Sequence, residues 1–364
     1  MMSLDVLTVV GARPQFVKAY PVSRALRERH EETLVHTGQH YDELLSDVFF
    51  EELALPTPDY HLEVGSAPHA QQQATMMRRL DHVVAAEEPD AVLVYGDTNS
   101  TLAAALVAAK RGPAVVHVEA GLRSDNWEMP EEVNRVLTDH CADVCCAPSE
   151  RAVENLRAEG ITEGVSLTGD VMYDAVLAVR ERAREQSKVL ADLGVAPGEF
   201  VLATVHRAAN TDDPDRLVEV VDGLLGVSLP VVLPAHPRTV AALHEHGLYE
   251  RASACLHLCD PLGYLDFVRL VETAARVATD SGGVQKEAFY LETPCVTLRD
   301  ETEWTETVNC GWNTLVGADA GEIVRALEAP FEASDHPPVY GDGDAATRVV
   351  DAVSELESGV HARP

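Results

Sequence analysis

Two acidic segments flank a polar loop in the stretch 117–135, which reads HVEAGLRSDNWEMPEEVNR. Glu119 follows the apolar run 114–118, which is typical of a buried strand. The carboxyl ends of such strands form the edge at which open α/β sheets bind ligands. Pro130 is a typical first helical residue, and Glu131 follows it in a first turn, where the helix dipole favours anions. Glu119 and Glu131 are therefore candidates for general acid and base; the alternative is that Glu131 and the adjacent Glu132 only decorate a helix N-terminus.

Polar or ionisable residues also follow most of the other predicted strands. A purely structural domain does not need such residues at its strand ends, so we interpret these loops as binding or catalytic. The residues are Arg13, His40, Asp97 and Glu119 in the first half and His206, His236, Ser281 and Arg299 in the second. A lone aspartate, Asp97, is weak evidence for magnesium, so we expect no metal site.

A phosphate-binding loop is predicted at Ser281-Gly282-Gly283, before a helix. Glycines allow close backbone approach, and a helix N-terminus presents free N–H groups to an anion. The sequence contains neither G-x-G-x-x-G nor G-x-x-x-x-G-K-[ST], so neither a nicotinamide cofactor nor a P-loop is expected.

The histidines fall into two groups. His117 lies inside an apolar run and His257 lies between Leu256 and Leu258, so both are interpreted as hydrogen-bonded core residues. His206 and His236 follow predicted strands and are interpreted as functional.

Strand-like and helix-like stretches alternate along the chain, which predicts parallel sheets with helices on both faces. The predicted strands are 6–10, 33–37, 91–95, 114–118, 144–146, 165–167, 200–205, 231–233, 277–279 and 295–298; the main helices are 14–29, 70–88, 100–110 and 344–356. The 364 residues predict two doubly wound domains. We place the first at 1–171, joined by a C-terminal helix 344–360, and the second at 172–343.

The composition narrows the environment and the partners. A net charge of −32, with lysine only at positions 18, 110, 188 and 286, is typical of a protein from a salt-rich cytoplasm, so we expect a halophilic source. No basic stripe exists to bind nucleic acid, and no apolar run approaches a membrane span. We expect a cytoplasmic homodimer. The seven cysteines, an odd number, are interpreted as free thiols.

Nine ordered motifs along nearly the whole chain resemble the non-hydrolysing UDP-N-acetylglucosamine 2-epimerases. They are GARPQFVKA from Gly11, HTGQHYD from His36, YGDTNST from Tyr95, HVEAGLRS from His117, MPEEVNR from Met129, TVHRAAN from Thr204, PAHPRT from Pro234, TDSGGVQKEA from Thr279 and RDETEW from Arg299. The resemblance implies a GT-B-like fold, in which two Rossmann-like domains hold a UDP-sugar between them. It implies interconversion of UDP-GlcNAc and UDP-ManNAc through elimination of UDP to a 2-acetamidoglucal and re-addition, with no cofactor.

The resemblance also implies roles for individual residues. The matching catalytic positions are Asp97, Glu119, Glu131 and His206. The matching UDP-binding positions are Arg13, Lys18, His236, Ser281, Gly282, Gly283 and Glu287, with Glu287 on the ribose.

The chain departs from the family pattern at two places. Ala209 stands where the family has a glutamate before Asn210, and Trp304 stands where many members have an arginine. Together with GGVQKEA, these features are similar to the subgroup acting on UDP-2,3-diacetamido-2,3-dideoxyglucuronate, whose charged sugar would need a cation such as Arg123 or Arg135. A GT-B glycosyltransferase, which would need an acceptor, and a catalytically inactive sugar-nucleotide sensor are the alternatives from other classes.

Overall fold

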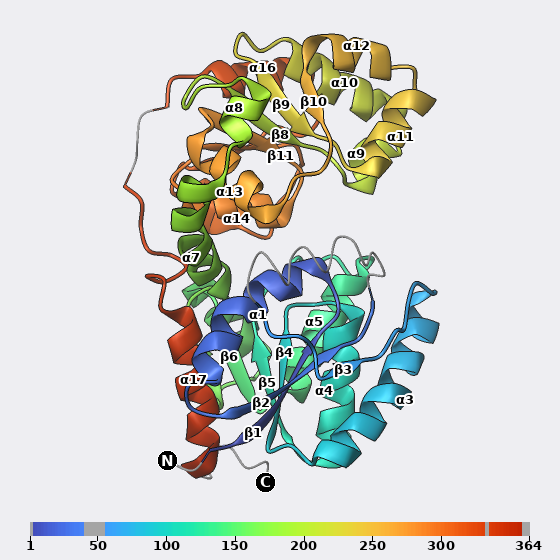
Figure 1. The fold of residues 1–364 in the computed structure, drawn as a ribbon, viewed down its shortest axis with the longest axis vertical. Coiled ribbons are helices and arrows are strands. Elements are labelled where there is room, and N and C mark those ends of the chain that lie inside the picture. The colour runs from blue at the N-terminus through green and yellow to red at the C-terminus, as the bar shows by residue number, and fades with distance from the viewer. Residues whose placement is uncertain (1–2, 40–54, 332–334, 359–364) are drawn as a thin grey trace. The chain divides into compact units, whose positions relative to one another are not determined.

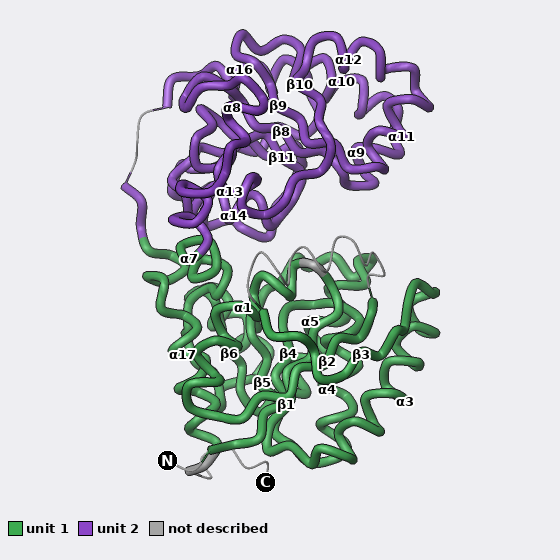
Figure 2. Tube along the Cα trace, in the orientation of Figure 1, with its two compact units in different colours: residues 1–178, 338–364 green, residues 179–337 purple. Residues whose placement is uncertain are grey.

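The computed structural model describes residues 3–39, 55–331 and 335–358. The chain divides into two compact units, which Figure 2 distinguishes by colour. Unit 1 comprises residues 1–178 and 338–364, and unit 2 comprises residues 179–337. Each unit is built around one parallel sheet, so the predicted doubly wound architecture is confirmed.

The sheet of unit 1 has the strand order β3-β2-β1-β4-β5-β6-β7, with parallel pairing throughout. The order reverses between β1 and β4, which makes this the switch point where open α/β sheets bind ligands. The strands are β1 (Asp5–Val10), β2 (Glu31–His36), β3 (Tyr60–His61), β4 (Ala91–Tyr95), β5 (Ala114–Val118), β6 (Val144–Ala147) and β7 (Val165–Leu167).

The helices of unit 1 cover its sheet with apolar faces. Leu7 and Val9 of β1 share one buried cluster with Met76 and Leu80 of α3 and with Ala104 of α4. The helices are α1 (Arg13–Leu26), α3 (His69–Glu87), α4 (Asn99–Arg111), α5 (Pro130–Cys141), α6 (Glu150–Ala158) and α17 (Ala345–Ser354), which a 3₁₀ turn (Glu355–Ser358) extends.

The C-terminal helix α17 packs beside α1 in unit 1 (Figure 1). The carboxylate of Asp174 accepts hydrogen bonds from the backbone N–H groups of Ala345 and Ala346, at 3.2 Å and 2.9 Å. Arg29, just after α1, forms an ion pair with Asp351 on α17. Helix α7 (Val171–Gln186) begins in unit 1 and ends in unit 2.

Unit 2 has the strand order β10-β9-β8-β11-β12-β13, again parallel, with its switch point between β8 and β11. The strands are β8 (Val201–Thr204), β9 (Val231–Pro234), β10 (His257–Cys259), β11 (Arg276–Thr279), β12 (Cys295–Thr297) and β13 (Asn313–Leu315). The helices are α8 (Val189–Leu193), α9 (Ala208–Thr211), α10 (Pro214–Leu225), α11 (Pro237–Glu245), α12 (Tyr249–Cys255), α13 (Tyr264–Thr273), α14 (Gly282–Tyr290), α15 (Thr305–Asn309) and α16 (Ala320–Glu328).

The sequence did not predict the short strands β3, β10 and β13. One consequence is that the interpretation of His257 as a core residue is wrong. His257 begins the edge strand β10, and its side chain is exposed, because only one neighbouring strand covers this edge of the sheet.

Candidate active site

Helix α1 and the end of β5 bring Lys18 and Glu119 together in unit 1. Glu119 directly follows β5 and adopts a left-handed backbone conformation, with φ of 69°. Lys18, on α1, forms an ion pair with its carboxylate, and both side chains are largely buried. A Cβ added to Gly96 would lie 3.2 Å from Glu119 Oε2 and 3.3 Å from Lys18 Nζ. Glycine at position 96, with φ of 61°, therefore leaves room for this pair.

The loop before α1 is held against the same strand ends. The buried Gln15 side chain accepts hydrogen bonds from the backbone N–H groups of Gly11 and Ala12, at 2.8 Å and 3.1 Å, and donates to the Tyr95 carbonyl at 2.9 Å. This arrangement fixes the start of α1 relative to the end of β4. The Arg13 side chain and all of His40 lie outside the described part of the chain.

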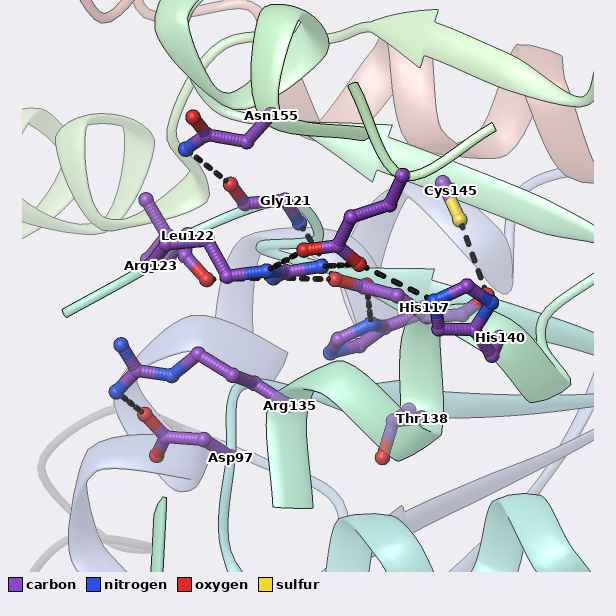
Figure 3. Close-up of polar contacts among 12 residues, drawn as sticks. Asp97, His117, Gly121, Leu122, Arg123, Arg135, Thr138, His140, Cys145 and Asn155 are labelled. Carbon is purple, nitrogen blue, oxygen red and sulfur yellow. Dashed lines mark hydrogen bonds and ion pairs between the residues drawn. The ribbon is translucent and has the colours of Figure 1, made fainter. Parts of the chain in front are cut away.

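Asp97, in the turn that follows β4, forms an ion pair with Arg135 of α5 (Figure 3). The Asp97 side chain is 32% exposed, so it remains accessible, whereas Arg135 is buried. Arg135 also lies 3.2 Å from the carboxylate of Glu132. Glu132 in turn accepts hydrogen bonds from Ser124 and from the backbone N–H of Asp125. The sequence indicated for Glu132 only a place at the start of a helix, whereas the structure shows that its carboxylate also holds the loop before α5.

Glu131 lies in the first turn of α5, as predicted, and its side chain is exposed. Residues four apart lie on the same face of a helix, so Glu131 lies one turn before Arg135. Because Arg135 pairs with Asp97, Glu131 shares its helix face with the partner of another proposed catalytic carboxylate.

A buried polar cluster that includes His117, Arg123 and Asp139 lies next to these strand ends (Figure 3). His117 is fully buried, and its ring nitrogens lie 2.7 Å from Asp139 and 2.8 Å from the Gly96 carbonyl oxygen. It is therefore the hydrogen-bonded core residue that the sequence predicted. Arg123 donates a 2.7 Å hydrogen bond to Asp139 and pairs with Glu159 at 2.6 Å.

The Asp139 carboxylate has a pKa below its ordinary value. Burial alone pushes this pKa upward, but the neighbouring His117 and Arg123 favour the ionised form and together outweigh burial. The cluster links the turn that carries Asp97 to β5, which precedes Glu119.

In unit 2, the loops after β8 and β9 bring two histidines near each other. His206 is 43% exposed, and its ring centroid lies 6.4 Å from that of His236. His236 caps α11, because its Nδ1 accepts a 3.1 Å hydrogen bond from the backbone N–H of Arg238. Asn210, which follows the departure at Ala209, is buried and donates to Asp280 and to the Leu298 carbonyl.

The predicted phosphate loop forms the start of α14, with Ser281 as the N-cap and Gly282 as the first helical residue. Glu303 and Trp304 lie against it, because a Cβ on Gly282 would lie 2.6 Å from Glu303 Oε1 and 3.0 Å from Trp304 Nε1. Arg299 pairs with Glu303 at 3.0 Å. Burial raises the Glu303 pKa, but the nearby Arg299 and Arg207 outweigh this effect and leave the pKa below its ordinary value.

Further along α14, Glu287 is largely buried and accepts a 2.9 Å hydrogen bond from the Tyr264 hydroxyl. The buried Lys286 places its ammonium 4.0 Å from the centroid of the Trp304 ring, which is a cation–π geometry. Trp304, the residue that replaces the usual arginine, is thus in contact with a cation.

Two further observations concern the described residues as a whole. Among them, no group of three or more histidine, cysteine, aspartate and glutamate side chains is arranged to hold a metal ion. No helix within residues 3–39, 55–331 and 335–358 combines the length and apolar composition that crossing a membrane requires.

Chemically, unit 1 offers carboxylates held beside cations, and unit 2 offers histidines and a helix N-terminus. Such carboxylates can exchange protons with a bound sugar, and a helix N-terminus can bind phosphate.

Comparison with known proteins identifies the family. A sequence model described as UDP-N-acetylglucosamine 2-epimerase matches residues 24–354. The chain is 44% identical to the UDP-2,3-diacetamido-2,3-dideoxy-D-glucuronate 2-epimerase of Pseudomonas aeruginosa, over 97% of this chain and 100% of the relative. It is 40% identical to the UDP-N-acetylglucosamine 2-epimerase of Methanocaldococcus jannaschii, over 94% of this chain and 96% of the relative.

The fold is similar to a solved structure of the M. jannaschii enzyme in complex with UDP-GlcNAc and UDP. The TM-score is 0.88 at 39% sequence identity, and the alignment covers 96% of this chain and 99% of the other. The chain therefore belongs to the UDP-N-acetylglucosamine 2-epimerase family of GT-B-like isomerases.

Proposed function

We propose that this protein interconverts UDP-GlcNAc and UDP-ManNAc without hydrolysing them. A base removes the proton at C2 of the sugar, the C–H electron pair forms the C1=C2 double bond, and UDP leaves from C1. The resulting 2-acetamidoglucal is protonated on the opposite face of C2, and UDP adds again at C1.

The observation that carries this proposal is the arrangement of Asp97 and Glu119 at adjacent strand ends, each paired with a cation. Proton removal and return on opposite faces of C2 require two groups with acid–base chemistry at one place. Carboxylates at such a place can accept a proton as a base and return one as an acid. We assign proton exchange to Asp97, Glu119 and Glu131, with His206 as a further catalytic residue.

We assign UDP binding to the loops of unit 2 and to the start of α1. The C2 proton of the sugar is not acidic, so elimination requires electrostatic stabilisation of the departing diphosphate. The N-terminus of α14 offers the N–H groups of Gly282 and Gly283 together with the Ser281 hydroxyl for this purpose. Arg13, Lys18 and His236 add positive or hydrogen-bonding groups, and Glu287 can accept hydrogen bonds from the ribose hydroxyls. We further propose that the protein acts in the cytoplasm as a homodimer, which size-exclusion chromatography with light scattering tests.

Proton NMR of UDP-GlcNAc in deuterated, salt-rich buffer tests the reaction. We expect UDP-ManNAc with deuterium at C2, because the proton added to the opposite face of C2 comes from a second group that exchanges with solvent. Epimerisation with the original hydrogen retained at C2, or no epimerisation of a UDP-sugar, would contradict the proposal.

Amide variants test the proposed carboxylates individually. Asp97→Asn, Glu119→Gln and Glu131→Gln are each expected to slow turnover by roughly 10²–10⁴-fold, the range for a lost acid or base. Glu128→Gln, at an exposed carboxylate just before α5, is the matched control and should turn over at the parental rate. Parental turnover in Glu131→Gln would show that this residue only decorates the helix N-terminus.

A specific observation favours a second substrate. The relative named for the diacetamido glucuronate substrate is 44% identical to this chain. UDP-2,3-diacetamido-2,3-dideoxyglucuronate is therefore the alternative substrate for the same 2-epimerase chemistry.

A further inference from the structure

Strands β8 and β11 end side by side in unit 2, at the switch point of the sheet. Thr204 pairs with Thr279 in the parallel register, and their hydroxyl oxygens lie 2.6 Å apart. The backbone N–H of Asp280 continues this pairing by donating to the Thr204 carbonyl at 3.3 Å. Asp280 therefore stands directly beside the loop that carries His206.

The Asp280 side chain is fully buried and accepts several hydrogen bonds from that loop. The backbone N–H of His206 lies 3.1 Å and 3.0 Å from the two carboxylate oxygens, and the backbone N–H of Arg207 lies 3.0 Å from Oδ2. The side-chain amide of Asn210 donates to Oδ2 at 3.1 Å. This one carboxylate therefore fixes both the backbone and the first helical turn after β8.

The carboxylate also faces the imidazole ring of His206. Asp280 Oδ1 lies 3.4 Å from His206 Nδ1, and within the described residues no other basic side chain lies within ion-pair distance of Asp280. An ionised carboxylate can only accept hydrogen bonds, so a proton on Nδ1 is favoured. His236 is a further titratable side chain near this ring, at 6.4 Å between centroids, and the Arg207 guanidinium lies 3.9 Å from Glu303.

We propose that Asp280 is a positioning residue that sets the orientation and tautomer of His206. With Nδ1–H directed at Asp280, Nε2 becomes the ring atom that is available to the substrate. Asp280 also directly precedes Ser281, so the same residue links the histidine loop to the proposed diphosphate loop. This inference rests on the proposed function for the catalytic role of His206, but its tautomer can be measured without turnover.

Nitrogen-15 NMR of histidine-labelled protein gives the direct test. We expect the neutral His206 ring of the full-length parent to carry its proton on Nδ1. In Asp280→Asn, the new amide can donate to Nδ1, so the proton should move to Nε2. A parental His206 protonated on Nε2, or a tautomer that Asp280→Asn leaves unchanged, would overturn the inference even if the enzyme is active. A parent that shows the expected tautomer but does not epimerise UDP-sugars would instead contradict the proposed function.

Kinetics distinguish positioning from a merely structural role. Asp280→Asn should lower kcat by roughly 10²–10⁴-fold, as expected for a histidine in the wrong tautomer, while the affinity for UDP stays parental. The pH limb that reports His206 should move to lower pH, because the anion that favours the imidazolium is gone. If kcat of Asp280→Asn falls only in proportion to the fraction of folded protein, and the pH profile does not change, then Asp280 has a structural role alone.

Two further variants keep the test decisive. Asp212→Asn, at an exposed carboxylate close to the same loop, should leave kcat, pH profile and tautomer unchanged. Asn210→Ser is the substitute test if Asp280→Asn does not fold. It removes one hydrogen-bond donor to Asp280 but keeps the Asp280 carboxylate, so we expect a smaller loss of kcat with parental UDP affinity. Parental kcat in Asn210→Ser, together with an unfolded Asp280→Asn, would count against a role in positioning His206.

Discussion

Lys18 and Glu119 form an ion pair above Gly96, at the edge of the unit 1 sheet where β4 and β5 end. The family resemblance implies that Lys18 binds UDP, whereas in this structure its ammonium contacts a proposed catalytic carboxylate. The two roles differ in consequence. If Lys18 acts by pairing with Glu119, its loss affects proton transfer at C2. If Lys18 contacts the nucleotide, its loss affects the binding of UDP.

A double-mutant cycle on Lys18 and Glu119 distinguishes these roles. We expect Lys18→Met to lower kcat by roughly 10–10³-fold, because Glu119 loses the ion pair that holds its carboxylate in place. If Lys18 acts through Glu119, the double variant Lys18→Met/Glu119→Gln should be no slower than Glu119→Gln alone. Steady-state kinetics of the four proteins with UDP-GlcNAc provides the measurement.

Calorimetric titration with UDP is the control for the cycle. Parental UDP affinity in Lys18→Met, together with strong non-additivity, supports the role at Glu119. Weakened UDP binding with additive losses of kcat/KM would instead assign Lys18 to the nucleotide.

Much of the fold could be predicted from the sequence, because strands buried on both faces appear as continuous apolar runs. The strands at 91–95 and 114–118 were predicted with the bounds that the structure has. The short edge strands β10 and β13 were missed, because three residues with partly exposed side chains carry no clear periodicity.

The partners of site residues could not be predicted in the same way. Glu119 has a left-handed backbone conformation, which a non-glycine residue rarely adopts. No sequence pattern predicted this conformation. The contact between Lys18 and Glu119 joins residues more than a hundred positions apart. Asp280 lies within a recognised motif, but only the pairing of β8 with β11 shows that its carboxylate accepts hydrogen bonds from the His206 loop.

Gly282 and Gly283 are adjacent, but we expect them to respond differently to alanine. A Cβ at Gly282 would lie 2.6 Å from Glu303 Oε1, whereas the nearest atom to a Cβ at Gly283 is 3.9 Å away. Gly282→Ala should therefore displace Glu303, lower Tm and weaken UDP binding by about tenfold, or 1.4 kcal/mol. Gly283→Ala should keep the parental Tm. Differential scanning fluorimetry with UDP titrations measures both effects, and an unchanged Tm in Gly282→Ala would contradict the close contact between α14 and Glu303.

Asp139→Asn should destabilise the protein in a pH-dependent way. The folded pKa of Asp139 is lowered, so its contribution to stability is fully present above the unfolded value, about 3.9, and is lost as pH falls through the folded value. Near neutral pH we expect a loss of about 3–5 kcal/mol, because a buried pairing with His117 and Arg123 is broken.

Urea unfolding of the parent and of Asp139→Asn between neutral and acidic pH, at fixed salt, measures this difference. The difference should shrink as the pH falls below the unfolded value. Asp81→Asn, at an exposed ion pair with Arg111, is the control and should show a much smaller effect at every pH. A difference for Asp139→Asn that stays constant or grows in acid would be inconsistent with a lowered pKa.

The net charge of −32 predicts that stability depends on salt. Self-repulsion between carboxylates weakens when the Debye length falls from about 10 Å at 0.1 M to about 3 Å at 1 M. We therefore expect Tm to rise between these KCl concentrations. An equal osmolality of sucrose is the control, since it acts without screening charge, and a Tm that rises no more in KCl than in sucrose would exclude screening as the cause.

The substrate preference depends on which cations remain available for a carboxylate at C6 of the sugar. Arg123 is committed to Asp139 and Glu159, and Arg135 is committed to Asp97 and Glu132. Therefore neither Arg123 nor Arg135 can bind a carboxylate of the sugar without breaking a buried ion pair. We therefore predict that UDP-GlcNAc has the higher kcat/KM.

Measuring kcat/KM for UDP-GlcNAc and for UDP-2,3-diacetamido-2,3-dideoxyglucuronate at identical salt tests this prediction. Arg123→Gln is the matched variant: we expect it to lower Tm, because Asp139 and Glu159 lose their partner, without changing the ratio of the two kcat/KM values. A site built for a charged group rejects the analogue that lacks it, since its buried donors are left unpaired. A preference of more than about a hundredfold for the uronic acid, worth some 2.7 kcal/mol in transition-state binding, would therefore reverse the assignment of substrate, and loss of that preference in Arg123→Gln would identify the cation responsible.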